Sequence, residues 1–191
     1  PLPNTGGSTG HASNFIFPID HSKVMTQLTL DSMAQYKELG VFQESGGIEL
    51  ARKTERLEEL KRRMASAKAW GIDASLATPA EVKDLFPWIS TDAIIGGFHS
   101  PSVGVVDSLR AGTIMRDKAK EMGALSVFTY TEITAIDVKD GQVRGLQTSK
   151  GNITAEYIII CCGVWSPKVA KMAGAAMALT PIVHQMIDVG P

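Results

Sequence analysis

The chain has 191 residues, of which 44% are hydrophobic and 20% are charged, and these proportions indicate a globular protein with a hydrophobic core rather than a disordered one. Its 19 basic and 20 acidic residues give a formal net charge of -1, so no basic surface for nucleic acid is expected. No uninterrupted run of about 18 apolar residues is present, and no membrane segment is expected.

The cysteines and histidines argue against a metal site. The two cysteines, Cys161 and Cys162, are adjacent, and the four histidines show no ligand spacing. Adjacent cysteines cannot join distant segments, which favours a reducing compartment. A metal-binding module is therefore the poorer interpretation, and His21 and His99 are given no functional role.

The first two thirds of the chain predict helices and short strands around a glycine-rich start. Residues 1–14 are small or turn-forming and predict a loop whose backbone can approach another molecule closely. Apolar spacing, Thr78 as a capping-box residue and Asp107 or Ser108 as a cap then place four helices. The predicted helices cover 22–39, 54–71, 78–86 and 108–122, with a strand at 48–51 and a strand, bend and returning strand over 93–107.

The last third predicts mainly strands. Four strands are expected at 124–130, 132–139, 142–149 and 153–160, followed by a helix at 166–172. The strand at 153–160 ends in four consecutive apolar residues, which is typical of a strand covered on both faces in a parallel sheet. Residues 180–190 alternate between two faces. Without a repeat or linker, the two halves are predicted to interleave as one α+β or α/β unit.

The segment GGSTGHA, residues 6–12, resembles the flavin-attachment segment of the dimethylglycine and sarcosine dehydrogenases, within the D-amino-acid-oxidase-like flavoproteins. Similar segments follow in the same order along almost the whole chain. They are GGIELA from residue 46, AWGIDASLATPAEVKDLFP from 69, GVVD ending at 107, ITAI from 133, CCGVWSP from 161 and PIVHQ from 181.

The resemblance implies a fold and a domain organisation. In that family, a strand with a GxGxxG fingerprint precedes the attachment segment. The chain is therefore expected to be an internal piece of an FAD-dependent oxidoreductase of the α/β class, with mixed α+β character. It would lack the N-terminal Rossmann βαβ and carry an interleaved, mixed-sheet substrate domain. Residues 1–40 and 107–175 would form the FAD side, and 41–106 and 176–191 the substrate side.

Cofactor-binding residues also follow from the resemblance. His11 would bond covalently to the 8α-methyl of FAD, the alternative being a loop histidine bonded to water. The other cofactor contacts would be Gly7, Ser8, Thr9, Gly10, Ile133, Gly163 and Trp165. Trp165 has core packing as its alternative. The family usually has glycine two or three residues past the histidine, where this chain has Ser13 and Asn14, and Asn tolerates the left-handed backbone that such a turn requires.

His184 resembles an active-site histidine that would orient the substrate or accept a proton from its amine, the alternative being a hydrogen-bonded core histidine. The implied reaction is oxidative demethylation of an N-methylated glycine, dimethylglycine or sarcosine, with hydride transfer from the N-methyl carbon to flavin N5. Two alternatives stay open, namely a flavin oxidase of another secondary or tertiary amine and a non-catalytic degenerate module.

The resemblance also suggests partners and location. The electron acceptor would be oxygen or an electron-transfer flavoprotein, and tetrahydrofolate could bind in a C-terminal region outside this chain. The location would be the bacterial cytoplasm or the mitochondrial matrix.

Overall fold

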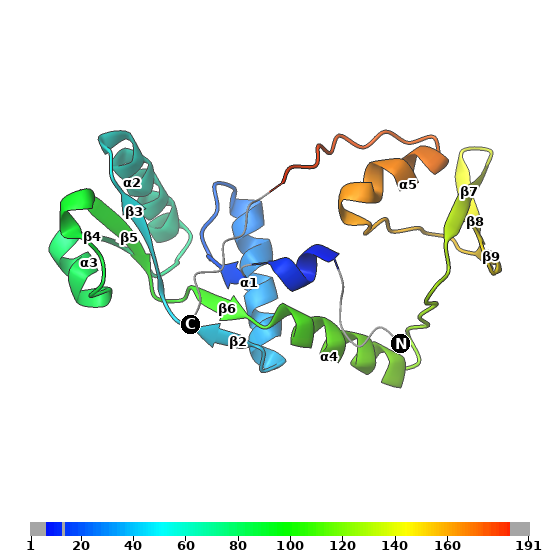
Figure 1. Cartoon of the computed structure of the whole chain (residues 1–191), viewed down its shortest axis with the longest axis horizontal. Helices are drawn as coiled ribbons and strands as arrows, with labels where there is room; N and C mark the ends of the chain where they lie inside the picture. The colour runs from blue at the N-terminus through cyan, green and yellow to red at the C-terminus, as the bar shows by residue number, and fades with distance from the viewer. Residues whose placement is uncertain (1–6, 13, 184–191) are drawn as a thin grey trace. The chain divides into compact units, whose positions relative to one another are not determined.

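The computed structural model describes residues 7–12 and 14–183 and divides into two compact units, one up to Leu125 and one from Ser126 (Figure 1). The first unit contains η1 (Gly7–His11), β1 (Phe15–Ile16), α1 (Lys23–Glu38), β2 (Phe42–Glu44), β3 (Gly47–Ala51), α2 (Thr54–Ala69), β4 (Ser75–Ala77), α3 (Pro79–Leu85), η2 (Thr91–Ala93), β5 (Gly96–Ser100), β6 (Gly104–Val106) and α4 (Ser108–Glu121). The second contains β7 (Ile133–Lys139), β8 (Gln142–Thr148), β9 (Gly151–Thr154), η3 (Gly163–Trp165) and α5 (Ser166–Met172). The assignment of residue ranges to an FAD side and a substrate side stays a prediction.

The helices of the first unit begin where their capping residues predict. At α3, Thr78 Oγ1 accepts a hydrogen bond from Glu81 N at 3.3 Å, and the Glu81 carboxylate accepts one from Thr78 N at 2.7 Å. At α4, Asp107 Oδ1 accepts a hydrogen bond from Arg110 N at 3.0 Å. At α2, by contrast, Thr54 is already helical, and Lys53 before it makes no side-chain cap. None of the helices among the described residues is both long and apolar enough to cross a membrane.

The glycine-rich stretch before α4 supplies the central strands of two different sheets. β5 lies between β3 and β4, whereas β6 lies between β1 and β2, and all these pairs are antiparallel. The predicted strand and returning strand over 93–107 are therefore present but do not pair with each other. β6 packs closely against β2 at Gly104, where a Cβ would collide with Gln43 O. Only glycine lets β6 lie this close to β2.

The sheet β3–β5–β4 packs against a helix on each of its faces. Phe98 points towards α2 and packs with Leu60 and Ala51, while the alternate residues of β5 face α3, where Val82 packs with Ala77. α1 packs Tyr36, near its C-terminal end, into the core. Near its start Met25 and Leu28 are exposed, and the buried residues of the helix are Thr26 and Met33.

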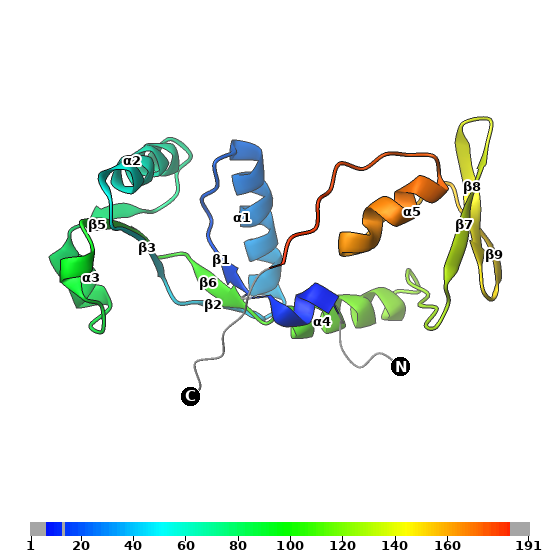
Figure 2. The same cartoon turned by 45° about the horizontal axis from the view of Figure 1, so that its top comes forward.

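The second unit is an antiparallel meander of β7, β8 and β9 with α5 after it (Figure 2). The predicted hairpin turn at Asp140–Gly141 is confirmed, with φ of 55° and 73°. Two predicted strands are wrong. Residues 124–130 are not a strand, and the strand predicted at 153–160 ends at Thr154. Tyr157 is 85% exposed, because no described strand continues the pairing there, and every strand pair in the described part of the chain is antiparallel.

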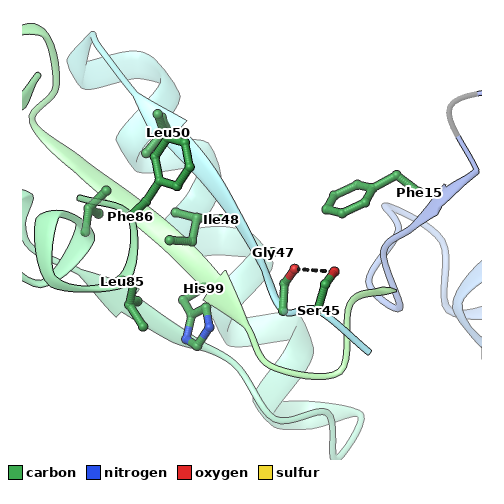
Figure 3. A pocket seen from close by; sticks show the side chains of 10 residues that line it. Phe15, Ser45, Gly47, Ile48, Leu50, Leu85, Phe86 and His99 are labelled. Carbon is green, nitrogen blue, oxygen red and sulfur yellow. Dashed lines mark hydrogen bonds between the residues drawn. The ribbon is translucent and has the colours of Figure 1, made fainter. Parts of the chain in front are cut away.

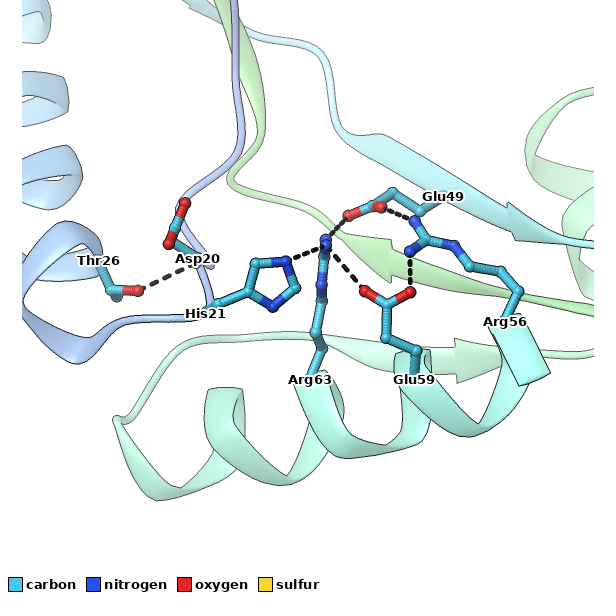
Figure 4. Close-up of polar contacts among 7 residues, drawn as sticks. All are labelled: Asp20, His21, Thr26, Glu49, Arg56, Glu59 and Arg63. Atoms are coloured by element: carbon cyan, nitrogen blue, oxygen red, sulfur yellow. Dashed lines mark hydrogen bonds and ion pairs between the residues drawn. The ribbon is translucent and has the colours of Figure 1, made fainter. Parts of the chain in front are cut away.

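A network of ion pairs joins α2 to β3 and to the segment that enters α1 (Figure 4). The Glu49 carboxylate of β3 accepts hydrogen bonds from both Arg56 and Arg63 of α2. Glu59 bridges the same two arginines, and Arg63 Nη2 lies 3.2 Å from His21 Nε2. The hydrogen bond from Arg56 lowers the pKa of the Glu59 carboxyl below its usual value. The network therefore fixes the segment before α1 against the β3–β5–β4 sheet.

Removing the central carboxylate of this network should destabilise the first unit. The side chains of Glu49 and Arg63 are only 18% and 16% exposed, so Glu49→Gln leaves two arginines with one carboxylate between them in a partly desolvated position. We expect a loss of about 1–3 kcal/mol in the free energy of unfolding, measured by denaturant titration of the complete protein. Glu58→Gln is the matched control, because its pair with Lys61 is half exposed, and it should not move the midpoint. Equal midpoints for the two variants would contradict this role of Glu49.

Candidate functional site

The segment predicted to hold a cofactor is a short 3-10 helix, η1, placed against the start of α4. Gly7 begins it with φ of 65°, and residues 7–10 are all exposed. Ser108 Oγ, in the first turn of α4, donates a hydrogen bond to Thr9 O at 3.1 Å. The main chain of Ser8 and Gly10 is thus held at the surface with only small side chains around it. His11 is the last residue of this helix.

Asn14 turns the chain from this helix into β1. Its φ of 59° lies in the left-handed region, which confirms the prediction that asparagine replaces the usual glycine of this turn. Asn14 O accepts a hydrogen bond from Val106 N at 2.9 Å. The side-chain Oδ1 is buried without a hydrogen-bond partner among the described residues. A buried acceptor without a donor is costly, so Asn14 Oδ1 is suited to accept a hydrogen bond from a bound group.

The residues of this turn fit a flavin cofactor. Space is open around Gly7, where a Cβ would meet nothing within 4 Å. Exposed backbone amides on small residues reach phosphate and sugar oxygens, as dinucleotide-binding loops do. Asn14 Oδ1 adds an acceptor, for which the hydroxyl and amine groups of the cofactor are donors.

The other predicted cofactor contacts lie in the second unit. Ile133 begins β7 and pairs with Thr148, and the register shifts directly after it. Gly163 has φ of 53° and opens η3, which ends at Trp165. Trp165 is 65% exposed, so the alternative that it simply fills a core does not hold within the described residues. The cofactor roles of Ile133, Gly163 and Trp165 stay predictions. His184 lies outside the described residues, and its catalytic role also stays a prediction.

A pocket that the sequence did not indicate lies between β3, β5 and α3 (Figure 3). It has a volume of about 380 Å³. The lining residues are Phe15, Ser45, Gly46, Gly47, Ile48, Leu50, Val82, Leu85, Phe86 and His99. The imidazole of His99 is half-buried there and has no hydrogen bond to a described residue. The sequence did not predict this site because its walls come from four separate elements. The one available signal was the alternation of side chains along β5, which places His99 and Phe98 on opposite faces of the sheet.

Comparison with protein families and curated proteins points to flavoenzymes. A family model described as FAD dependent oxidoreductase matches residues 3–191. The chain is 29% identical over 196 residues to mouse mitochondrial sarcosine dehydrogenase and 25% identical over 190 residues to rat mitochondrial dimethylglycine dehydrogenase. It is also 28% identical over 167 residues to the mouse mitochondrial pyruvate dehydrogenase phosphatase regulatory subunit. These matches cover 96%, 96% and 84% of this chain but only 21%, 22% and 19% of those proteins.

A solved structure agrees. The L-proline dehydrogenase from P. horikoshii superposes with a TM-score of 0.82 at 26% identity, over 88% of this chain and 46% of that one. The predicted fold class is thereby confirmed, with small antiparallel sheets in the described part of the chain.

The turn at Asn14 gives a test that separates backbone shape from side-chain chemistry. Asn14→Val puts a β-branched residue at a positive φ, which costs about 1–2 kcal/mol, and should displace the turn and lower the flavin content. Asn14→Gly accepts this backbone freely and should retain more flavin than Asn14→Val. The flavin-to-protein absorbance ratio of the purified complete protein measures both. If glycine loses as much flavin as valine, the carboxamide matters rather than the turn, and the prediction is wrong.

Proposed function

The chain belongs to the FAD-dependent oxidoreductase family, and on that premise we propose that the complete protein oxidises an N-methylated glycine, dimethylglycine or sarcosine, with loss of the methyl group. The observation that carries this proposal is the exposed GSTGH turn, held against α4 and followed by the left-handed Asn14. Its support is the similarity to sarcosine and dimethylglycine dehydrogenases along 96% of the chain.

The chain's own residues bind and orient in this scheme. Gly7, Ser8, Thr9 and Gly10 hold the cofactor through main-chain groups, and His11 is proposed as its covalent attachment point. A bound FAD supplies the acceptor for the hydride that leaves the N-methyl carbon of the substrate. The resulting iminium reacts with water and releases the methyl carbon as formaldehyde. His184 keeps the substrate amine neutral by accepting its proton, because the amine lone pair must be free to expel hydride.

Partners and location follow the same proposal. The substrate is a small N-methyl amino acid, and the electrons pass to oxygen or to an electron-transfer flavoprotein. The matched sarcosine and dimethylglycine dehydrogenases are mitochondrial by name, which favours the mitochondrial matrix over the bacterial cytoplasm for a eukaryotic source. The alternative enzyme is a flavin oxidase of another secondary or tertiary amine. The structural similarity to an L-proline dehydrogenase supports this alternative, because proline is a secondary amine.

A non-catalytic role is the second candidate. The similarity to a protein named as a regulatory subunit of a phosphatase favours it. The sequence upstream of the turn in the complete protein separates the two candidates. An enzyme that binds FAD needs a GxGxxG fingerprint there, directly after a strand. A complete reading frame without that fingerprint would favour the non-catalytic module.

Covalent attachment at His11 is tested on a denaturing gel of the complete protein. We expect a fluorescent flavin band for the wild type and none for His11→Ala, because an alanine side chain has no nitrogen to bond to the flavin. A yellow protein that loses its colour on unfolding would show that the flavin is bound without a covalent link, which contradicts attachment at His11 but not the assignment as a flavoenzyme. Colourless protein from the start would favour the non-catalytic module.

The role of His184 is tested by turnover at constant flavin content. His184→Ala should lower kcat by about 10²–10⁴-fold while the flavin absorbance stays, because a positioned proton acceptor contributes that much. The loss should shrink as the pH rises and free amine becomes abundant in solution. Turnover equal to that of the wild type would remove His184 from the site.

A further inference from the structure

The pocket between β3, β5 and α3 has a polar end and an apolar end (Figure 3). His99 and Ser45 lie at one end, next to the glycine turn that leads into β3, and Leu50 and Phe86 lie at the other. None of the ten lining residues carries an acidic or a lysine or arginine side chain. Such a pocket matches a ligand with one polar head and an apolar body.

Two glycines line the polar end of the pocket. Gly46 has φ of 69°, and a Cβ on it would contact His99 Nε2 at 3.6 Å. A Cβ on Gly47 would lie 2.6 Å from Val103 Cγ1 and 3.1 Å from Phe15 Cζ, so the chain can only pass here without a side chain. The His99 imidazole lines the pocket, and its Nε2 makes no hydrogen bond to the described residues. A half-buried ring nitrogen without a protein partner is suited to bind a ligand.

The pocket is close to the proposed attachment point of the flavin. Phe15, which lines it, follows His11 by four residues, and four residues span at most about 14 Å. The two positions also belong to the same compact unit. One wall residue of the pocket therefore lies within about 14 Å of the proposed attachment point.

The size of the pocket exceeds what the smallest N-methyl amino acids need. Its volume of about 380 Å³ lies in the range of roughly 300–1,000 Å³ that holds drug-sized ligands. Dimethylglycine has no apolar body beyond its methyl groups and would leave the Leu50 and Phe86 end to water.

We propose that this pocket binds N-methyl amino acids with an apolar side chain, with His99 Nε2–H donating a hydrogen bond to the substrate carboxylate and the side chain lying between Ile48, Leu50 and Phe86. This inference rests on the flavin-dependent oxidation of an N-methyl amine that is proposed above, and it widens the substrate from N-methylated glycines to N-methyl amino acids with an apolar side chain. Water solvates the second carboxylate oxygen at this exposed end of the pocket, since the Ser45 hydroxyl donates its hydrogen bond to Gly46 O at 3.1 Å. His99 is then a binding residue of the substrate.

The apolar end is tested by substrate preference in the complete flavoprotein. We expect kcat/KM for N-methyl-leucine to exceed that for N-methylglycine at least tenfold, because burying an isobutyl group favours binding by that factor or more. Phe86→Ala removes a wall of the pocket and should cut this preference about tenfold. Trp88→Ala is the matched control, because Trp88 contacts the Phe86 ring edge-to-face but does not line the pocket.

The polar end is tested by a split of KM from kcat. His99→Leu should raise KM about tenfold for both substrates and leave kcat within about twofold, because the carboxylate contact is the same in the ground state and the transition state. His99→Gln keeps a donor and should recover part of the loss. His21→Leu, a histidine of the same unit outside the pocket, should leave KM unchanged.

A binding experiment separates the pocket from the reaction. 4-Methylpentanoate has the carboxylate and the apolar chain but no amine to oxidise, so its Kd, measured by calorimetry on the complete protein, reports the pocket alone. We expect Phe86→Ala and His99→Leu each to weaken this binding about tenfold. If binding depends on both residues but no amine is oxidised, the inference about the pocket stands and the proposed function is wrong.

Two outcomes would overturn the pocket. Oxidation of N-methylglycine with no preference for N-methyl-leucine, and no effect of either variant, would leave the proposed function and remove this inference. No binding of 4-methylpentanoate to the wild type would mean that another part of the complete protein or a different ligand fills the space.

Discussion

The junction between β6 and α4 is the constraint on which the first unit depends. Within three consecutive residues, Val106 N donates to Asn14 O, Asp107 N donates to Val41 O, and Ser108 Oγ donates to Thr9 O. Asp107 also caps α4. One short stretch of chain thus positions the proposed cofactor turn, the strand after it and the end of α1. Gly104 allows this arrangement, since any side chain there would push β6 away from β2.

The two faces of the β3–β5–β4 sheet differ in what they contact, because successive side chains of a strand point to opposite faces. On the α2 face, Phe98 packs in the core and Glu49 pairs with two arginines, which holds the face rigid. On the opposite face, α3 is only seven residues long and covers the sheet in part. The uncovered part is the pocket that contains His99. A rigid face behind a partly open one is the arrangement that a binding site needs.

The proposed chemistry divides between two kinds of group. Main-chain amides on small residues hold a cofactor without competing side chains, and a few imidazoles handle protons and carboxylates near neutral pH. The exposed turn at Gly7–His11 belongs to the first kind, and His99 and His184 are proposed for the second. The chain spans about a fifth of the length of the curated relatives it matches.

By itself the sequence determined the local features. Capping residues such as Thr78 and Asp107 act on amides three residues away, so their helices could be predicted, and the small residues of GSTGH and the left-handed Asn14 followed from local backbone preferences. Tertiary structure decided the rest. The apolar run ending at residue 160 is not a strand past Thr154, and β5 and β6 belong to different sheets, because pairing depends on partners far along the chain. The pocket around His99 needs four elements brought together, which no local pattern records.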